Sequence, residues 1–189
     1  MDINRASELP IRTALSGPAA GVVGAVAVAA RSLESNLITL DIGGTSTDVC
    51  LIEKGIATMT YGREIADFPV RLPSIDIHTV GAGGGSIAFI GRDGLLKVGP
   101  TSAGAVPGPA CYGRGGTKPT VSDANIILGR LPETLLGGAM TLDKSAAADA
   151  VQLLALKLDL GLHETALGIL RIVTSNVVRA IRAVSIERG

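Results

Sequence analysis

Aromatic residues are nearly absent from this 189-residue chain: they make up 2% of it, and tryptophan does not occur. Proteins that hold single-stranded nucleic acid stack bases on aromatic side chains, so this scarcity argues against such a platform. A basic surplus is also missing, because lysine plus arginine equals aspartate plus glutamate at 17 each. We therefore expect neither nucleic acid nor an anionic membrane surface as a partner.

Cysteine is scarce too, with Cys50 and Cys111 as the only two. Neither belongs to a CxxC pair, and two cysteines in a chain of this length do not indicate a secreted disulfide scaffold. Cys50 lies in an apolar run that is typical of a buried, inert thiol. Cys111 lies in a glycine- and proline-rich stretch, where a more reactive thiol remains open.

A long, strongly apolar run is the third absence. Residues 13–30 carry no charge, but they include Pro18 and many small side chains. A membrane span needs about 20 strongly apolar residues, and a signal peptide needs a basic start. A buried, alanine-rich helix fits this stretch better, and the expected location is cytoplasmic.

What the chain does have is aliphatic side chains: hydrophobic residues make up 47% of it and charged residues 18%. This composition predicts a folded protein with an aliphatic core. Its length suits a single domain, here 1–189, with helices layered over a mixed sheet. We expect a β-rich core at about 37–98, a Gly/Pro loop at 99–119 and a helical part at 120–189.

The expected elements follow from periodicity and from capping residues. Helices are predicted from Ser16–Pro18 to Leu33, over 121–128 after Thr120, from Asp143 to Leu158, and over 163–188. Strands are predicted at 37–42, 47–53, 57–61, 70–72, 75–80, 86–90 and 95–98.

The first chemical motif is the segment Asp41 to Asp48, which reads DIGGTSTD. Gly43 and Gly44 leave room for a ligand, and their N–H groups can converge on an anion. The hydroxyls of Thr45, Ser46 and Thr47 add donors. Asp41 and Asp48 are oxygen ligands of the kind that Mg²⁺ prefers, so both are candidate catalytic residues and Asp41 a candidate metal ligand. The alternative is a plain β-hairpin; no Walker A motif occurs.

A second glycine-rich segment runs from Asp76 to Ser86 and reads DIHTVGAGGGS. Gly83, Gly84, Gly85 and Ser86 are candidate nucleotide-binding residues, although a tight bend between strands is the simpler alternative. Asp76 and His78 would share one strand face if residues 75–80 form a strand. They are candidate metal ligands, or else a structural hydrogen-bonded pair.

Asp123 follows the Gly/Pro loop in the segment TVSDAN. A carboxylate in the first turn of a helix is favoured by the helix dipole alone, and that is the reading the sequence supports best. A role as a metal ligand stays open.

Several long motifs resemble the hydantoinase A/5-oxoprolinase family in order and in content. They are LSGPAAGVVGA, LDIGGTSTDV, DIHTVGAGGGSIA, VGPTSAGAVPGPACYGRGGTKPTVSDANIILGRL and AIRAVSIERG. The resemblance covers nearly the whole chain. The family includes the A subunit of N-methylhydantoinase and the β subunit of acetone carboxylase.

The resemblance implies an α/β, actin-like ATPase (ribonuclease H-like) domain. It implies ATP with Mg²⁺ as cofactors, a second divalent metal being left open, and a small cyclic amide or imide as substrate. Members phosphorylate a carbonyl or carboxyl group, and a B-type subunit or domain completes the reaction. Family chains also carry an earlier DxGGT motif and a later adenosine-binding segment. Since we find neither here, we expect a central segment that binds ATP weakly and turns nothing over.

Four functions stay open at this stage. The first is part of an ATP-dependent ring-opening hydrolase, and the second is part of an acetone-type carboxylase. The third is a sugar kinase-like domain, although such kinases usually carry the DxGGT motif on their first strand. The fourth is a non-catalytic assembly module.

Overall fold

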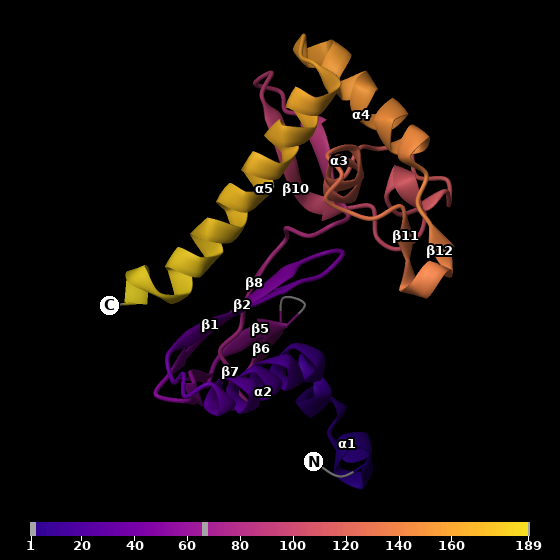
Figure 1. Ribbon diagram of the computed structural model, residues 1–189. Helices are drawn as coiled ribbons and strands as arrows, with labels where there is room; N and C mark the ends of the chain where they lie inside the picture. Colours follow the sequence, from indigo (N-terminus) through magenta and orange to yellow (C-terminus); the bar gives the residue numbers. More distant parts are fainter. Residues whose placement is uncertain (1–2, 66–67, 189) are drawn as a thin grey trace. The chain divides into compact units, whose positions relative to one another are not determined.

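The computed structural model describes residues 3–65 and 68–188, which divide into two compact units (Figure 1). Unit 1 contains the described residues of 1–41, 48–79 and 181–189. Unit 2 contains residues 42–47 and 80–180. The single hydantoinase A-type domain expected over 1–189 stays a prediction.

Unit 1 begins with helices and continues with short strands. Its elements are α1 (Ile3–Glu8), α2 (Ser16–Arg31), β1 (Leu37–Ile42), β2 (Thr47–Glu53), β3 (Ile56–Ala57), β4 (Met59–Thr60), β5 (Arg63–Ile65), β6 (Phe68–Val70), β7 (Ser74–Ile75) and β8 (His78–Val80), with 3-10 turns at Pro10–Thr13 and Ile186–Arg188. The predicted strands at 37–42 and 47–53 are confirmed to the residue. The predicted strand at 57–61 is divided between β3 and β4, and the one at 70–72 lies earlier, in β6.

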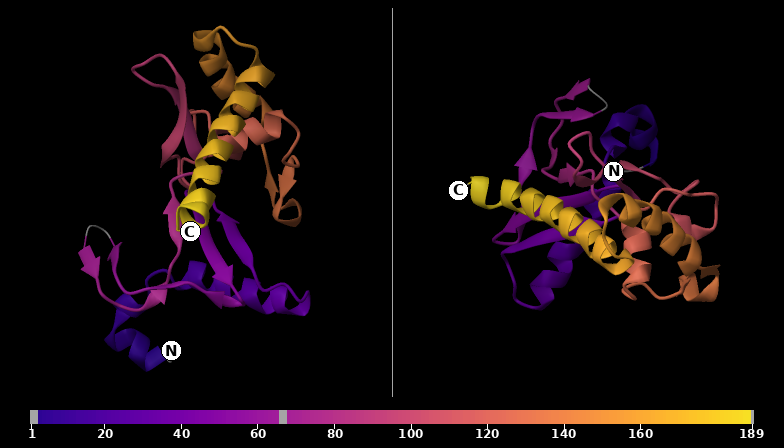
Figure 2. Two further views of the ribbon diagram at one scale, coloured as in Figure 1. Left: turned by 90° about the vertical axis from the view of Figure 1, so that its left-hand side faces the viewer. Right: turned by 90° about the horizontal axis from the view of Figure 1, so that it is seen from above.

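Strand β2 is the centre of the only four-stranded sheet among the described residues, where it pairs with β1, β3 and β8. Its apolar side chains Cys50 and Ile52 are buried together with Val22 of α2 and with Ile77. Helix α2 therefore packs along this sheet, as the second views show (Figure 2). The core of unit 1 is small and aliphatic.

Helix α2 begins at Ser16, as its sequence predicts, with Pro18 in the first turn where the missing N–H is tolerated. It ends at Arg31 and not at Leu33, because Leu33 adopts a left-handed conformation with φ of 59°. Across residues 3–65 and 68–188, we find no helix with the length and hydrophobicity that crossing a bilayer requires.

Unit 2 is built from one longer hairpin and three helices. Its elements are β9 (Ser86–Ile90), β10 (Leu96–Ser102), α3 (Val121–Ile127), β11 (Thr134–Leu135), β12 (Met140–Thr141), α4 (Lys144–Leu158) and α5 (Leu162–Val184), with 3-10 turns at Ala110–Tyr112 and Leu136–Gly138. The hairpin at 86–98 and all three predicted helices are confirmed. Helix α5 ends at Val184, earlier than predicted.

The core of unit 2 lies where the β9–β10 hairpin meets the three helices. Ile126 of α3, Val151 of α4 and Ile169 of α5 are buried in one apolar cluster. The Asn176 side chain of α5 donates to the Val98 carbonyl of β10 at 3.4 Å, so α5 lies along β10 (Figures 1 and 2). This cluster packs β9, β10 and part of the loop between β10 and α3 against the three helices.

Candidate functional site

The turn between β1 and β2 is closed by its own backbone. The Gly43 N–H donates to the Ser46 carbonyl at 2.9 Å. Gly44 and Thr45 are exposed, and Ser46 is half-buried. In the part of the chain that the structure describes, the N–H groups of Gly44, Thr45 and Ser46 donate to no protein acceptor. Three N–H groups and two hydroxyls are therefore available to an anion at this turn.

The glycine triplet of the second motif packs directly against this turn. The Gly84 N–H donates to the Gly43 carbonyl at 3.0 Å, and the Gly85 N–H donates to the Gly44 carbonyl at 2.6 Å. The Gly83 N–H donates to the Ser86 hydroxyl at 2.9 Å. These N–H groups are already occupied, so the geometry favours a supporting role for the triplet. A nucleotide contact by Gly83, Gly84, Gly85 or Ser86 stays a prediction.

Only glycine fits this close approach. A Cβ on Gly83 would lie 2.6 Å from the Gly43 carbonyl oxygen, and one on Gly85 would lie 2.9 Å from the Gly44 oxygen. Both distances are shorter than a nonbonded carbon–oxygen contact allows. The triplet is therefore needed for the pairing of two backbone segments, whatever ligand the turn binds.

Further hydrogen bonds connect the triplet to the rest of unit 2. The Ser122 N–H at the start of α3 donates to the Gly84 carbonyl at 2.8 Å, and the Ala103 N–H donates to the Gly85 carbonyl at the same distance. The buried Thr47 hydroxyl donates to the Ala82 carbonyl at 2.5 Å. Thr47 thus holds the turn in place, and a direct ligand contact by Thr47 stays a prediction.

Asp41 and Asp48, which flank the turn in sequence, belong to unit 1. Both line one hollow of about 350 Å³ between α2 and β1. The Thr79 hydroxyl donates to the Asp48 carboxylate at 2.5 Å. Asp41 is exposed and Asp48 is half-buried. The structure therefore brings together the two carboxylates that the sequence singled out, and adds Thr79, which no sequence signal pointed to.

Asp76 and His78 do not share a strand as predicted. The strand expected at 75–80 is divided into β7, which ends at Ile75, and β8, which begins at His78, because β7 pairs with β4 whereas β8 pairs with β2. Neither Asp76 nor His78 is among the residues that line the hollow of Asp41 and Asp48. Within residues 3–65 and 68–188, no group of three or more His, Cys, Asp or Glu side chains could hold a metal ion. The roles of Asp76, His78 and Asp123 as metal ligands stay predictions.

Asp123 is fully buried in unit 2 and forms a capping box with Thr120 at the start of α3. Its carboxylate accepts from the N–H groups of Thr120 and Cys111 at 2.9 and 2.8 Å, and from the Thr120 hydroxyl at 2.7 Å. The Ala110 N–H adds a longer bond of 3.3 Å. Asp123 thus fixes the path of the Gly/Pro loop, which begins with the last residues of β10.

The Cys111 thiol lies beside this carboxylate and is fully buried. Burial raises its pKa far above the ordinary range, and the negative charge of Asp123 raises it further. A thiol that keeps its proton is a poor nucleophile. The reactive role that the sequence left open for Cys111 finds no support in this environment.

Comparison with known proteins gives these features a context. The family model described as hydantoinase/oxoprolinase matches residues 1–189. The chain is 44% identical to the caprolactamase subunit alpha of Pseudomonas jessenii, over 92% of this chain and 25% of that subunit. It is 41% identical to the acetophenone carboxylase gamma subunit of Aromatoleum aromaticum, over 94% of this chain and 25% of that subunit.

Two solved structures share the fold. The ATP-dependent caprolactamase from Pseudomonas jessenii superposes with a TM-score of 0.83 at 44% identity, over 92% of this chain and 26% of that one. The nucleotide-free acetone carboxylase superposes with a TM-score of 0.81 at 32% identity, over 89% of this chain and 24% of that one. The predicted α/β class, part of an actin-like ATPase fold, is thereby confirmed.

The chain thus spans about a quarter of the length of these relatives. The family match nevertheless extends over all of its residues, and the identities to the caprolactamase and acetophenone carboxylase subunits exceed 40%. Three of the five motifs that carried the resemblance form the glycine turn, the triplet and the Asp123 network, and the other two lie in α2 and at the end of α5. The chain belongs to the hydantoinase/oxoprolinase family.

Proposed function

We propose that this chain is part of the ATP-dependent subunit of an enzyme that phosphorylates a cyclic amide or imide and opens its ring by hydrolysis. The observation that carries the proposal is the exposed turn Gly44–Ser46, whose N–H groups have no protein acceptor among the described residues. Caprolactamase, at 44% identity, is described as ATP-dependent, which supports ATP as the ligand.

Phosphate oxygens suit this turn for a physical reason. Backbone N–H groups in a rigid turn can surround an anion without the entropic loss of ordering side chains. The glycine triplet holds the carbonyls of Gly43 and Gly44, so the N–H groups beside them keep their direction. We infer that Gly44, Thr45 and Ser46 contact the phosphates, while Gly83–Gly85 hold these turn residues in position.

Asp41 and Asp48 are the residues that would hold Mg²⁺. The hollow that they share offers hard oxygen ligands, and Thr79 fixes one carboxylate of the pair. Bound Mg²⁺ would neutralise phosphate charge during phosphoryl transfer.

A carboxylase subunit is the second candidate function. The acetophenone carboxylase gamma subunit is 41% identical to this chain, close to the value for caprolactamase. Both functions use the phosphate turn in the same manner and differ in the substrate, which would be a cyclic amide or a ketone. A partner subunit of B type and a cytoplasmic location belong to either proposal.

Activity assays of the longer protein with its partner subunit separate the two candidates. We expect ATP hydrolysis that depends on a lactam or imide such as caprolactam or 5-oxoproline, and none that depends on a ketone with bicarbonate. Ketone-dependent hydrolysis alone would assign the protein to the carboxylases.

A double variant, Thr45→Val with Ser46→Ala, tests the turn itself in the same assay. It removes both hydroxyls of the turn and should lower ATP turnover at least about a hundredfold, as loss of phosphate-stabilising donors does. The variant Thr141→Val, at an exposed hydroxyl in β12, is the matched control and should keep full activity. Equal activity in the double variant and the control would contradict the proposal.

A further inference from the structure

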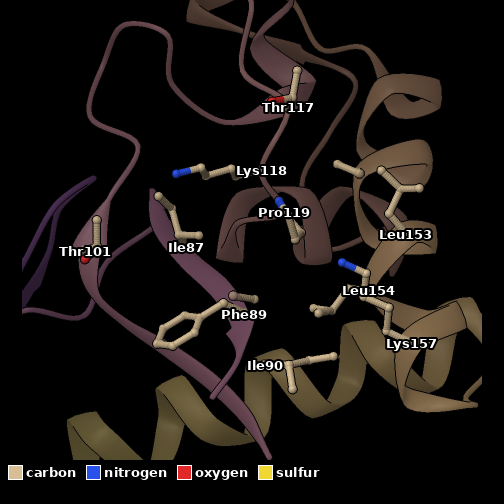
Figure 3. Close-up of a pocket in the computed structure, with 12 residues that line it drawn as sticks. Ile87, Phe89, Ile90, Thr101, Thr117, Lys118, Pro119, Leu153, Leu154 and Lys157 are labelled. Carbon is tan, nitrogen blue, oxygen red and sulfur yellow. The ribbon is translucent and has the colours of Figure 1, made fainter. Parts of the chain in front are cut away.

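A second hollow opens in unit 2, between β9 and the C-terminal half of α4 (Figure 3). Its volume is about 570 Å³, within the range of small-molecule sites in proteins. None of the residues of the phosphate turn or of the glycine triplet lines it. It is therefore a separate feature that the proposed ATPase function does not use.

The walls of this hollow are apolar. Ala88 and Ala150 are buried, and their small side chains leave the space open. Phe89 and Leu153 line it while 41% and 64% of their surfaces remain exposed. Apolar side chains of this size gain from being covered, at roughly 25 cal/mol per Å² of apolar surface removed from water.

Besides β9 and α4, the segment Thr117–Pro119 forms a third wall, and main-chain hydrogen bonds hold it in place. The Ala88 N–H donates to the Pro119 carbonyl at 2.8 Å, and Ile87 forms an isolated β-bridge with Thr120. Thr120 is itself fixed by the Asp123 capping box. The hollow is thus preformed, and Lys118 projects from a backbone of fixed path.

Two lysines are the only charged residues that line the hollow. Lys118 comes from the loop and Lys157 from α4, on different walls, as Figure 3 shows. The ion pair found among the described residues joins Lys97 to Asp93, and no carboxylate lines the hollow. Two ammonium groups beside apolar walls complement an anion with an apolar body.

We propose that this hollow binds a small amphiphilic carboxylate, a monoanion with an aliphatic or aromatic body. A carboxylate supplies one negative charge to a site lined by two lysines, while the apolar walls take the rest of the molecule. Phosphate is a poorer match, because the α4 residues that line the hollow, from Ala150 to Lys157, lie far along the helix from its N-terminal N–H groups. Walls on three sides favour a small molecule over a protein segment.

Titration of the ¹⁵N-labelled 189-residue chain with octanoate tests this site by NMR. We expect saturable shifts at the amides of Phe89 and Leu153, with a Kd below about 1 mM. Octanamide has the same apolar body without the charge, and it should bind about tenfold more weakly. Inorganic phosphate at the same concentrations should leave these amides unshifted.

Two variants isolate the contribution of each lysine. Lys118→Gln and Lys157→Gln should each lower the octanoate affinity severalfold and leave that for octanamide unchanged. Lys144→Gln is the matched control, because Lys144 is an exposed lysine at the other end of α4 and does not line the hollow. All three sites are exposed, so the variants should keep the fold.

Three results would overturn the proposal. The first is equal affinity for octanoate and octanamide, and the second is an equal effect of Lys144→Gln. The third is octanoate shifts that map away from β9 and α4, or inorganic phosphate that shifts the amides of Phe89 and Leu153. None of these results bears on the phosphate turn, because that turn is tested with ATP and with different variants.

Discussion

At the scale of single residues, Asp123 is a buried side chain that holds the Gly/Pro loop to the start of α3. It is fully buried, and its carboxylate serves four donors that belong to the Gly/Pro loop and to the start of α3. Removing a buried acceptor of this kind lowers the free energy of unfolding, because its donors are left buried without a hydrogen-bond partner and out of reach of water.

We therefore expect Asp123→Ala to lower the free energy of unfolding by about 3 kcal/mol or more. Asp143 offers a matched control, since it caps α4 through one bond to the Ala146 N–H but is exposed. Asp143→Ala should lower the same free energy by only about 1 kcal/mol. Urea denaturation followed by circular dichroism measures both, and equal losses would contradict the anchoring role of Asp123.

Cys111 gives a second expectation, about pH. Because its pKa is raised in the folded state, the native protein keeps a proton that the unfolded chain releases above about pH 8.5. The unfolded state then binds fewer protons, so the free energy of unfolding should fall as the pH rises beyond that point. Cys111→Ala should remove part of this fall between about pH 8.5 and 10. An unchanged slope in the variant would show that Cys111 does not cause it.

At the scale of elements, the central feature is the pair of backbone hydrogen bonds that joins the glycine triplet to the turn Gly43–Ser46. In Gly83→Ala the new Cβ would meet the Gly43 carbonyl oxygen at 2.6 Å, so the two segments must separate. We expect the affinity for ATP to fall at least about tenfold, because the N–H groups of the turn lose their direction.

Gly24→Ala is the control for this change. Gly24 lies in α2, where an added Cβ meets nothing within 4 Å. That variant should keep the ATP affinity and gain about 0.5–1 kcal/mol of stability, as glycine-to-alanine changes in helices do. Nucleotide binding is measured by calorimetry, and an unchanged affinity in Gly83→Ala would exclude a positioning role for the triplet.

The sequence predicted most elements, and the reasons for its misses are local. Strands β1 and β2 are apolar runs on either side of a glycine turn, and helices α3 and α4 begin at clear caps, Thr120 and Asp143, so their limits were found to within a residue. Residues 75–80 alternate like one strand, but their two halves pair with different strands, β7 with β4 and β8 with β2. Tertiary contacts of that kind leave no trace in a local pattern.

The candidate site was predictable only in part. Glycines and carboxylates can be read from the sequence, and the pairing of Asp41 with Asp48 follows from a turn between adjacent strands. The direction of the N–H groups cannot be read from the sequence. In the structure, the N–H groups of Gly84 and Gly85 donate to the turn and not outward to a ligand. The contact of Thr79 with Asp48 depends on the fold, and so does the placement of Lys118 and Lys157 around the second hollow.

At the scale of the whole molecule, the two units differ in the size of their cores. Unit 2 buries a large aliphatic cluster that joins β9, β10 and all three of its helices, whereas the cluster of unit 1 centres on Val22, Cys50, Ile52 and Ile77. A smaller apolar core gives a lower free energy of opening.

Hydrogen exchange should therefore show two levels of protection. We expect the amides of Val151 and Ile169 to exchange more slowly than those of Cys50 and Ile52, by at least about tenfold. Native-state exchange followed by NMR, with rates corrected for sequence, is the measurement. Equal protection throughout would mean that the two units open together as one cooperative body.

The central claim is that the turn Gly44–Ser46 binds phosphate, and NMR titration of the ¹⁵N-labelled chain with Mg-ATP tests it most directly. We predict weak, saturable binding above the micromolar range, with no steady ATP hydrolysis by this chain alone. The largest shifts should fall on the amides of Gly44, Thr45 and Ser46, with smaller ones at Gly84 and Gly85. Shifts that are absent from the turn, or largest at residues far from it, would contradict the claim.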